Sequence, residues 1–323
     1  MTGSVDRPAG PVVVDVLLAT YNGVRHLPGQ LQSLLEQSHQ RFRLLVSDDG
    51  SSDGTQALLQ QWLPRFDGRM VLLDNPAPGR GVARNFEFLM QSSLDDGVAR
   101  YAAFCDQDDV WLPPKLATLL AALQELEQRR GAAAAALVHC DLAVVGPGLE
   151  PIHPSFVRHQ RLLPVPGSDV GLLSINQVTG CAMLVNRALL QAALPLPGSA
   201  LMHDWWCALL AAGGGRQFVD QALVLYRQHG ANQLGAKGRS LHQRLLRLLR
   251  EGPAVLRRVR ALGRGTLAQA IALRQRLDER RQDSAWVADY LAWRERPLRR
   301  RVAGWRSYYG RPLLDGLSRL LLW

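Results

Sequence analysis

Three carboxylates stand within four residues at Asp106-Gln-Asp-Asp109, directly after the apolar run Tyr101–Cys105. Carboxylates this close repel one another, and either a divalent cation or exposure at a turn offsets the repulsion. Mg²⁺ and Mn²⁺ prefer oxygen ligands and are typically held by one or two carboxylates together with the phosphates of a substrate. The triplet by itself therefore leaves two interpretations open, a metal site for a phosphate-bearing substrate or a plain acidic turn.

Two further polar clusters follow apolar runs in the same way. The run Val12–Ala19 leads into Thr20–Gly23, and Phe42–Ser47 leads into Asp48–Thr55. Such runs are typical of strands buried on both faces of a parallel sheet, and these sheets bind ligands outside the carboxyl ends of their strands. Because all three clusters would meet at this edge, the sequence favours a nucleotide and metal site there.

The phosphates of such a nucleotide need a positive partner. The chain has neither a Gly-x-Gly-x-x-Gly motif after the first strand nor a Gly-x-x-x-x-Gly-Lys-Ser/Thr motif. The two common glycine-rich phosphate loops are therefore excluded. A divalent cation, Mg²⁺ or Mn²⁺, is the economical way to balance the phosphate charge.

Alternating strands and helices must position the three clusters. Ser51, Ser52 or Asp53 is expected to cap the helix that follows the second strand. Residues 146–171 are rich in Pro, Gly and His without a period, which predicts a long surface loop lining a substrate site. We expect strands at 12–19, 42–47, 69–73, 101–105, 137–145, 178–185 and 222–226, and helices at 26–38, up to 63, 82–93, 113–130, 187–193 and 205–212.

Composition narrows the class of protein. A length of 323 residues with 47% hydrophobic residues allows one large α/β domain plus an appendage and excludes global disorder. The four cysteines lack zinc-site spacing, so buried reduced thiols are expected. Residues 1–10 lack the apolar core of a signal peptide, and no apolar run reaches transmembrane length. We therefore expect a cytoplasmic protein.

The basic charge lies in the C-terminal quarter. From Arg239 onward 20 arginines accompany 7 acidic residues, a net charge of +13 in a chain whose total is +10. Ser240–Leu262 places leucines and valines at helical spacing with arginines between them, and Trp305, Tyr308 and Tyr309 follow further on. A basic amphipathic helix is typical of attachment to an anionic membrane surface. The alternatives are a helical extension packed on the main domain or on a dimer partner, and nucleic-acid binding, for which no motif occurs.

In their order along the chain, several short motifs resemble the family 2 glycosyltransferases with the GT-A fold, and within them the bacterial rhamnosyltransferase-like members. The likeness extends over about residues 12–235. The motifs are Ala-Thr-Tyr-Asn-Gly at 19–23, Ser-Asp-Asp-Gly-Ser-Ser-Asp-Gly-Thr at 47–55, Gly-x-x-x-Asn-Phe at 81–86, Asp-Gln-Asp-Asp-Val-Trp at 106–111, Thr-Gly-Cys at 179–181, His-Asp-Trp-Trp at 203–206 and Tyr-Arg-Gln-His-Gly at 226–230.

The resemblance implies an α/β fold, a Rossmann-like mixed sheet flanked by helices, with a basic helical extension. The implied division is a disordered segment 1–10, a catalytic domain 11–238 and a helical region 239–323. It also implies roles for single residues. Thr20, Tyr21 and Asn22 would border the nucleotide, Asp48 would bind a pyrimidine base, and Asp106 would face the ribose. Asp108 would be the principal metal ligand, and His229 would contact the metal or the diphosphate. Asp204 would be the general base.

The chemistry expected from these residues is transfer of a sugar with inversion. One carboxylate suffices to take the proton of the acceptor hydroxyl, and a cation stabilises the departing diphosphate. A retaining route would need a nucleophilic carboxylate, for which the sequence offers no clear candidate. Trp111, Trp205 and Trp206 are expected in the core, and His203 is either a structural neighbour of the base or part of the site.

The substrates follow from the resemblance as well. The expected donor is dTDP-L-rhamnose, with UDP-glucose or UDP-galactose as alternatives, and the acceptor is a glycan or lipid-linked sugar in cell-surface polysaccharide synthesis. The expected location is the inner face of the cell membrane, reached through the C-terminal helices, without nucleic-acid binding. Whether the chain forms a homo-oligomer stays open, and a non-catalytic docking protein is the alternative outside the enzyme class.

Overall fold

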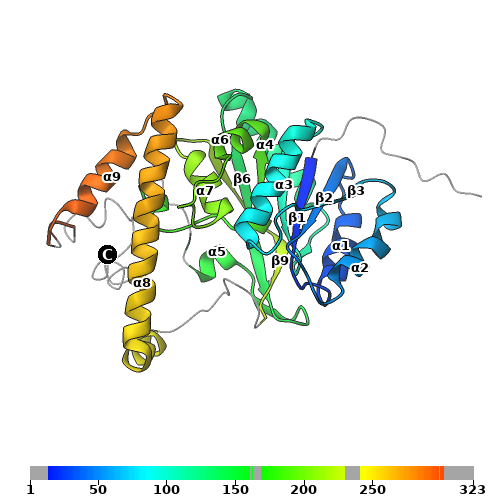
Figure 1. Ribbon diagram of the computed structural model, residues 1–323, viewed down its shortest axis with the longest axis horizontal. Helices are drawn as coiled ribbons and strands as arrows, with labels where there is room; N and C mark the ends of the chain where they lie inside the picture. Colours follow the sequence, from blue (N-terminus) through cyan, green and yellow to red (C-terminus); the bar gives the residue numbers. More distant parts are fainter. Residues whose placement is uncertain (1–13, 161, 163–168, 230–240, 298, 302–323) are drawn as a thin grey trace, which may run out of the picture.

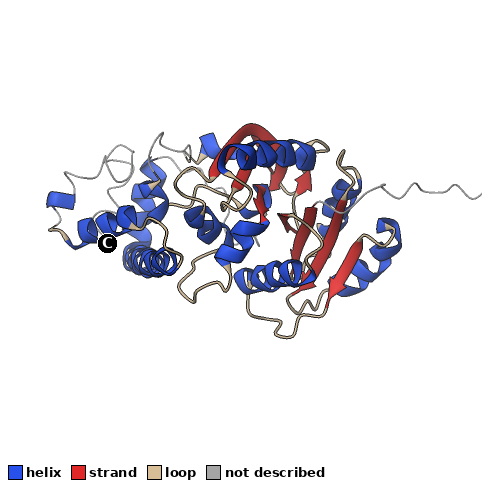
Figure 2. Cartoon of the chain, turned by 90° about the horizontal axis from the view of Figure 1, so that it is seen from above, coloured by secondary structure: helices blue, strands red, loops and turns tan. Residues whose placement is uncertain are grey.

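The computed structural model describes residues 14–160, 162, 169–229, 241–297 and 299–301. In these ranges the chain forms a central sheet with helices on both of its faces (Figure 2). A long helix and a shorter one beside it lie at one end of the molecule (Figure 1). The predicted disorder of residues 1–10 and the aromatic residues beyond 302 lie outside the described part.

The described strands form a single mixed sheet. They are β1 (Val14–Thr20), β2 (Phe42–Asp48), β3 (Met70–Leu73), β4 (Tyr101–Asp106), β5 (Val110–Trp111), β6 (Leu137–Val145), β7 (Pro151–His153), β8 (Met183–Asn186) and β9 (Arg216–Arg227). Their spatial order is β3-β2-β1-β4-β8-β6-β9-β5, with β7 paired to β6. The first four strands in space run parallel to one another, whereas β8 runs antiparallel to β4 and β6. The predicted mixed α/β fold is thus confirmed.

The register of the parallel strands brings the polar clusters together. Thr20 at the end of β1 is paired with Asp48 at the end of β2, and Ala19 is paired with Asp106 at the end of β4. All seven residues of β1 are buried, because helices cover both faces of this part of the sheet. Three strands that the sequence identifies by apolar runs therefore deliver their polar ends to one edge.

Helices connect the strands and cover the sheet. They are α1 (Leu27–Leu35), α2 (Thr55–Trp62), α3 (Val82–Asp96), α4 (Lys115–Arg130), α5 (Phe156–His159), α6 (Arg187–Ala193), α7 (His203–Leu210), α8 (Leu241–Glu279) and α9 (Ala285–Glu295), with short 3₁₀ turns η1 (Leu63–Phe66), η2 (Val170–Leu173) and η3 (Gly180–Ala182). The predicted cap of α2 is wrong in its position. Gly54 with φ of +93° precedes the helix and no side chain caps it, although Asp53 accepts a hydrogen bond from the backbone of Thr55.

Two predicted segments differ from the structure. The expected loop at 146–171 contains β7, α5 and the start of η2. The expected strand at 178–185 begins only at Met183, because Thr179 and Gly180 lead into the turn η3. An apolar run such as Cys181–Val185 does not reveal by its pattern where a turn ends and a strand begins.

The C-terminal helices pack against the main body through one apolar face. Leu273 and Leu277 of α8 and Val287, Tyr290 and Trp293 of α9 are buried and belong to the same core cluster as the side chains of α7. Each such burial contributes about 1.5–3 kcal/mol, so this contact holds the two helices in place. The predicted helix at 240–262 thus continues to Glu279. The domain boundary at 238 stays a prediction.

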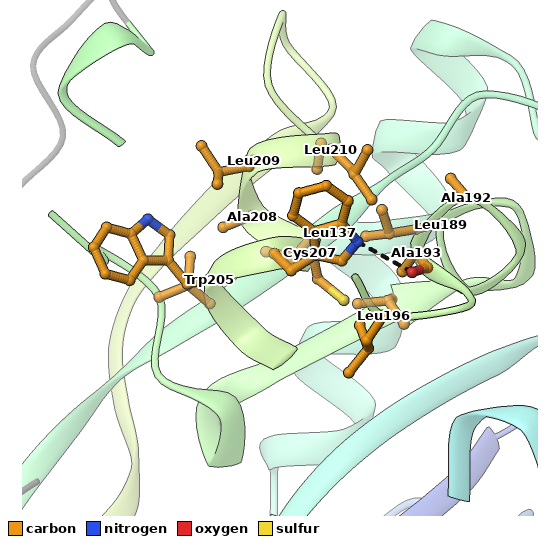
Figure 3. Close-up of a cluster of buried hydrophobic side chains, with 14 of the residues drawn as sticks. Leu137, Leu189, Ala192, Ala193, Leu196, Trp205, Cys207, Ala208, Leu209 and Leu210 are labelled. Carbon is orange, nitrogen blue, oxygen red and sulfur yellow. Dashed lines mark hydrogen bonds between the residues drawn. The ribbon is translucent and has the colours of Figure 1, made fainter. Parts of the chain in front are cut away.

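Helix α7 lies at the centre of this core cluster. Figure 3 shows Trp205, Cys207, Leu209 and Leu210 of this helix among apolar neighbours. The indole nitrogen of Trp206 donates to the carbonyl of Ala193, and that of Trp205 donates to the carbonyl of Leu172. The tryptophans are therefore core residues, as expected, and they fix the helix whose first turn carries Asp204.

Other expectations from composition can be compared with the structure. All four cysteines are buried and none forms a disulfide. Among the described helices, none combines the length and the apolar character that crossing a membrane requires.

Candidate active site

A pocket of about 370 Å³ opens at the ends of β2 and β3. Asp48 and Gln56 contribute polar groups to it, and Val46, Leu59 and Leu72 contribute apolar walls. A planar base that buries its faces and offers one N–H at its edge matches this combination. The sequence places Asp48 in such a pocket through the resemblance alone, and the structure supplies the cavity.

The carboxylate of Asp48 is held by several hydrogen-bond donors. The Thr20 hydroxyl donates to its Oδ1 atom at 2.8 Å, and the Ser51 backbone and the Gln56 amide donate to Oδ2 at 2.8 and 3.0 Å. Burial alone would raise the pKa of Asp48, but these donors outweigh burial and lower it. The carboxylate therefore stays ionised at neutral pH.

Asp49 is buried and fixes the loop that follows the pocket residue Pro78, a role that the sequence did not indicate. Its carboxylate accepts hydrogen bonds from the backbone of Gly79, Arg80 and Gly81, at 2.7, 3.3 and 2.8 Å. The loop before α3 is thereby held against the end of β2. The only available signal was a second aspartate at the strand end and two glycines thirty residues later.

The loop after β1 is tied to both neighbouring clusters. The Gln107 side chain accepts a hydrogen bond from the Tyr21 nitrogen at 2.8 Å and donates one to the Tyr21 carbonyl at 2.9 Å. Asn22 has a left-handed backbone with φ of +47°, and its side chain accepts from the Ser52 nitrogen. The Tyr21 ring is 56% exposed, so it is available to a ligand at this edge.

The three carboxylates of the acidic triplet lie in different surroundings. Asp106 is half-buried. The loss of water around its carboxyl group, together with the charge of Asp108, raises its pKa to about 7. The Asp108 side chain is 18% exposed, and its Oδ2 atom lies 2.7 Å from Nε2 of His229. Asp109 is fully buried and accepts a hydrogen bond from the Arg227 nitrogen at 3.1 Å. Asp109 thus holds the turn, whereas Asp108 is accessible to a ligand.

The triplet offers the donor atoms that a hard cation needs. Asp108 and the imidazole of His229, 2.7 Å apart, offer a carboxylate oxygen and a ring nitrogen that Mg²⁺ or Mn²⁺ can accept. A second grouping, Asp106, Asp109 and the Cys181 thiol, has its ligand atoms within 4.8 Å of one another. A thiol is a poor ligand for these ions and both Asp109 and Cys181 are buried, so the accessible carboxylate of Asp108 is the better candidate ligand.

A buried lysine, Lys115, lies near the triplet, and no motif in the sequence indicated it. The Lys115 ammonium donates to the Cys181 carbonyl at 2.6 Å and lies over the Trp111 ring, 2.9 Å from its centroid. Burial lowers the pKa of Lys115 to about 8, although the charge of Asp109 opposes this shift. The start of α4 is thereby joined to the turn η3.

Asp204 approaches the triplet from the first turn of α7. Its charge contributes to the raised pKa of Asp106, which places both carboxylates in one site. Its own pKa rises to about 6 because burial outweighs the hydrogen bonds from the Trp205 and Gly180 backbone and from Asn176. A carboxyl group with such a pKa is suited to exchange protons near neutrality.

His203, the neighbour of Asp204, is enclosed by aromatic rings. Its ring centroid lies 4.1 Å from that of Phe86 and 5.2 Å from that of Phe104. Burial lowers its pKa to about 3, so the imidazole is neutral. The structure therefore favours the interpretation of His203 as a structural neighbour.

The described part of the chain thus brings the predicted site residues to one edge of the sheet. Thr20, Tyr21, Asn22 and Asp48 lie on the pocket side, Asp106 and Asp108 belong to the triplet, where Asp108 lies beside His229, and Asp204 binds the turn η3, whose Cys181 lies beside Asp106. Residues that the sequence did not identify are Asp49, Gln107, Lys115 and Asn176.

Comparison with known proteins gives this arrangement a family. Residues 15–162 match the model of the glycosyl transferase family 2. TuaG of Bacillus subtilis (strain 168), a glycosyltransferase assigned to teichuronic acid biosynthesis, is 28% identical over 218 residues, which is 67% of this chain and 79% of TuaG.

Two shorter matches have names that state a donor. The UDP-Glc:alpha-D-GlcNAc-diphosphoundecaprenol beta-1,3-glucosyltransferase WfgD of Escherichia coli is 33% identical over 105 residues, 32% of this chain and 38% of WfgD. The dTDP-rhamnosyl transferase RfbG of Shigella flexneri is 30% identical over 99 residues, 31% of this chain and 34% of RfbG. Each match spans little more than a third of the relative.

The fold itself is similar to that of a solved structure. TarS 1-349 of S. aureus in complex with UDP-GlcNAc superposes with a TM-score of 0.58 at 13% identity, over 94% of this chain and 75% of that one. The mixed sheet, the edge that gathers its carboxylates and the matched family model agree. The chain therefore contains a glycosyl transferase family 2 domain with a GT-A fold, and the protein is a glycosyltransferase.

Proposed function

We propose that this protein is an inverting, metal-dependent glycosyltransferase that moves a hexose from a nucleotide-sugar to a glycan or lipid-linked acceptor in cell-surface polysaccharide synthesis. The observation that carries this proposal is the position of Asp204. Its Oδ2 atom accepts a hydrogen bond from the Gly180 nitrogen in the turn η3, and the thiol of the next residue, Cys181, lies within 4.8 Å of ligand atoms of Asp106 and Asp109. Asp204 itself stands on a separate element, in the first turn of α7. A single carboxylate of this kind is what an inverting transfer requires of its base.

The donor would lie along the edge from the pocket to the triplet. Asp48 would bind the pyrimidine base, and Asp106 would face the ribose. Asp108 and His229 would hold Mg²⁺ or Mn²⁺, which supplies Lewis-acid stabilisation of the departing diphosphate when bound. Thr20, Tyr21 and Asn22 would border the nucleotide from the loop after β1.

The identity of the donor is proposed from the relatives. RfbG is named a dTDP-rhamnosyl transferase, which supports dTDP-L-rhamnose. WfgD is named for UDP-glucose, which makes this the second candidate. Both carry a pyrimidine, in agreement with a pocket whose lining combines the polar side chains of Asp48 and Gln56 with apolar ones.

Attachment to the inner face of the cell membrane is proposed for the C-terminal region. Arg257, Arg260 and Arg264 of α8 are exposed and recur at helical spacing, and Ile271 further along is 44% exposed. Cations beside an exposed apolar side chain suit an anionic lipid surface.

Two experiments test the transferase proposal. Asp204→Asn should bind nucleotide like the wild type and lose transfer by about 10³-fold, because the acceptor proton has no base. A panel of dTDP- and UDP-sugars, assayed for binding and hydrolysis with and without Mn²⁺, should show metal-dependent turnover of a pyrimidine donor. Full transfer by Asp204→Asn, or equal turnover without a divalent cation, would overturn the proposal.

A further inference from the structure

The two oxygens of Asp204 are hydrogen-bonded unequally. Oδ1 accepts from the Asn176 side-chain nitrogen at 3.0 Å and from the Trp205 backbone at 2.6 Å. Oδ2 accepts from the Gly180 backbone at 2.9 Å. A carboxylate oxygen has two lone-pair directions. Both directions of Oδ1 are therefore used, whereas Oδ2 keeps one for a further donor.

The orientation of the Asn176 amide is fixed by a neighbour. Its Oδ1 atom accepts a hydrogen bond from the Val178 nitrogen at 3.1 Å. Because that contact requires an acceptor, the opposite end of the amide, the NH₂ group, must face Asp204. The backbone N–H of Val178 thus fixes Asn176 as a donor to Asp204.

The turn that binds Oδ2 is anchored from both sides. A Cβ atom at Gly180 would lie 2.8 Å from Nε2 of His203, so only glycine allows this approach. The next residue, Cys181, is held through its carbonyl by Lys115. The Gly180 N–H therefore keeps its direction toward Asp204.

We propose that Asn176 is a positioning residue which saturates Oδ1 of Asp204 and leaves Oδ2 as the atom that takes the acceptor proton. This inference rests on the proposed role of Asp204 as the base. In the step, the acceptor O–H bond breaks and an Oδ2–H bond forms. The acceptor oxygen bonds to the anomeric carbon of the sugar, and the bond from that carbon to the phosphate oxygen breaks with its electron pair leaving on the diphosphate.

The test compares Asn176→Ala with Gln177→Ala. Gln177 is the adjacent amide and is buried, but it bonds Arg216 and not Asp204. The readouts are nucleotide binding and the dependence of kcat on pH. Loss of the Asn176 donor removes one interaction that favours the ionised carboxylate of Asp204, so the pKa of Asp204 should rise by about one unit. The acidic limb of the kcat–pH profile should therefore move upward by about one pH unit.

For Asn176→Ala we therefore expect a kcat about fivefold below the wild type near pH 6, a smaller loss near pH 8, and a nucleotide affinity within about threefold. Gln177→Ala should keep the acid limb of the wild type. Asn176→Asp, which has the same shape but puts a second carboxylate beside Oδ1, should move the limb further upward.

An equal loss of kcat at every pH in both Asn176 variants would overturn the inference, because a merely structural role predicts that result. Folding of each variant is checked by its thermal unfolding, and the isosteric Asn176→Asp serves if the alanine variant does not fold. Asp204→Asn separates the two levels. If Asp204→Asn retains transfer, Asp204 is not the base. If Asp204→Asn loses transfer but the acidic limb of the kcat–pH profile stays in place in the Asn176 variants, Asp204 remains the base and only the positioning role of Asn176 is overturned.

Discussion

Nε2 of His229 lies 2.7 Å from Oδ2 of Asp108, although 121 residues separate the two in the sequence. His229 follows β9, and its ring stacks on that of His26 at a centroid distance of 4.8 Å. The loop before α1, the acidic triplet and the end of β9 therefore meet at Asp108. A ligand bound to Asp108 would contact all three segments.

Replacement of Asp108 should disable metal binding. Asp108→Asn keeps the size of the side chain but removes its charge, and we expect the affinity for Mn²⁺ to fall about 100-fold, since charged oxygens dominate the binding of hard cations. Isothermal titration of Mn²⁺ in the presence of UDP or dTDP measures this. Asp95→Asn, an exposed carboxylate on α3 that bonds Gln91, is the matched control, and equal Mn²⁺ affinity in both variants would remove Asp108 from the metal site.

Asp204 should cost the enzyme stability. Its folded pKa of about 6 lies above the ordinary value of 3.8. Between these pH values the folded state holds a proton that the unfolded state has lost, so the free energy of unfolding falls as pH rises from about 4 to about 6 and stays low above that. Asp204→Asn lacks this fall and should be more stable at pH 7, by up to about 3 kcal/mol.

Urea unfolding at several pH values measures the difference. The gain of Asp204→Asn over the wild type should vanish toward pH 4, where both side chains are neutral in the folded protein. A gain that is independent of pH would mean that the carboxylate is not held in an unfavourable ionised form.

Lys115 should contribute to the stability of the fold, because it joins the start of α4 to the turn η3. Lys115→Met has a similar length, but it leaves the Cys181 carbonyl without its donor and the neighbouring Asp109 without a nearby cation. Leaving a buried hydrogen-bonding group without its partner typically costs about 1–3 kcal/mol. Gln128→Met, at an exposed position of the same helix, is the control in chemical denaturation, and a loss below about 1 kcal/mol for Lys115→Met would contradict this role.

The basic face of α8 should attach the protein to anionic lipid. We expect Arg257→Glu, Arg260→Glu and Arg264→Glu in combination to abolish co-sedimentation with vesicles containing phosphatidylglycerol, since each cation near such a surface contributes about 1 kcal/mol. Transfer to a soluble acceptor should remain. Undiminished co-sedimentation of the triple variant would assign the attachment to another part of the chain.

The part of the site that the sequence predicted consists of residues at strand ends. Continuous apolar runs identify β1, β2 and β4, and parallel strands present their ends at one edge, so Thr20, Asp48 and Asp106 could be expected to meet. The roles assigned to Asp108 and Asp204 came from the order of the motifs and remain to be tested.

The residues that the sequence missed act through contacts with distant segments. Asn176 meets Asp204 only because the backbone turns at Gly180, and Lys115 meets Cys181 across 66 residues. No local periodicity encodes such contacts, since propensity and pattern report only on neighbours within a few residues. The same reason explains why Thr179–Cys181 was expected in a strand.

The side chain of Gln107 pairs with the backbone of Tyr21 as a neighbouring strand would. Its amide offers one donor and one acceptor to a backbone, as a peptide group does, and so it extends the pairing of β1 with β4 past the point where the strands part. A Cβ atom at Gly23 would lie 2.1 Å from the Gln107 oxygen. Gly23 therefore leaves room for the Gln107 amide, which joins the loop after β1 to the acidic triplet in the way a peptide group would.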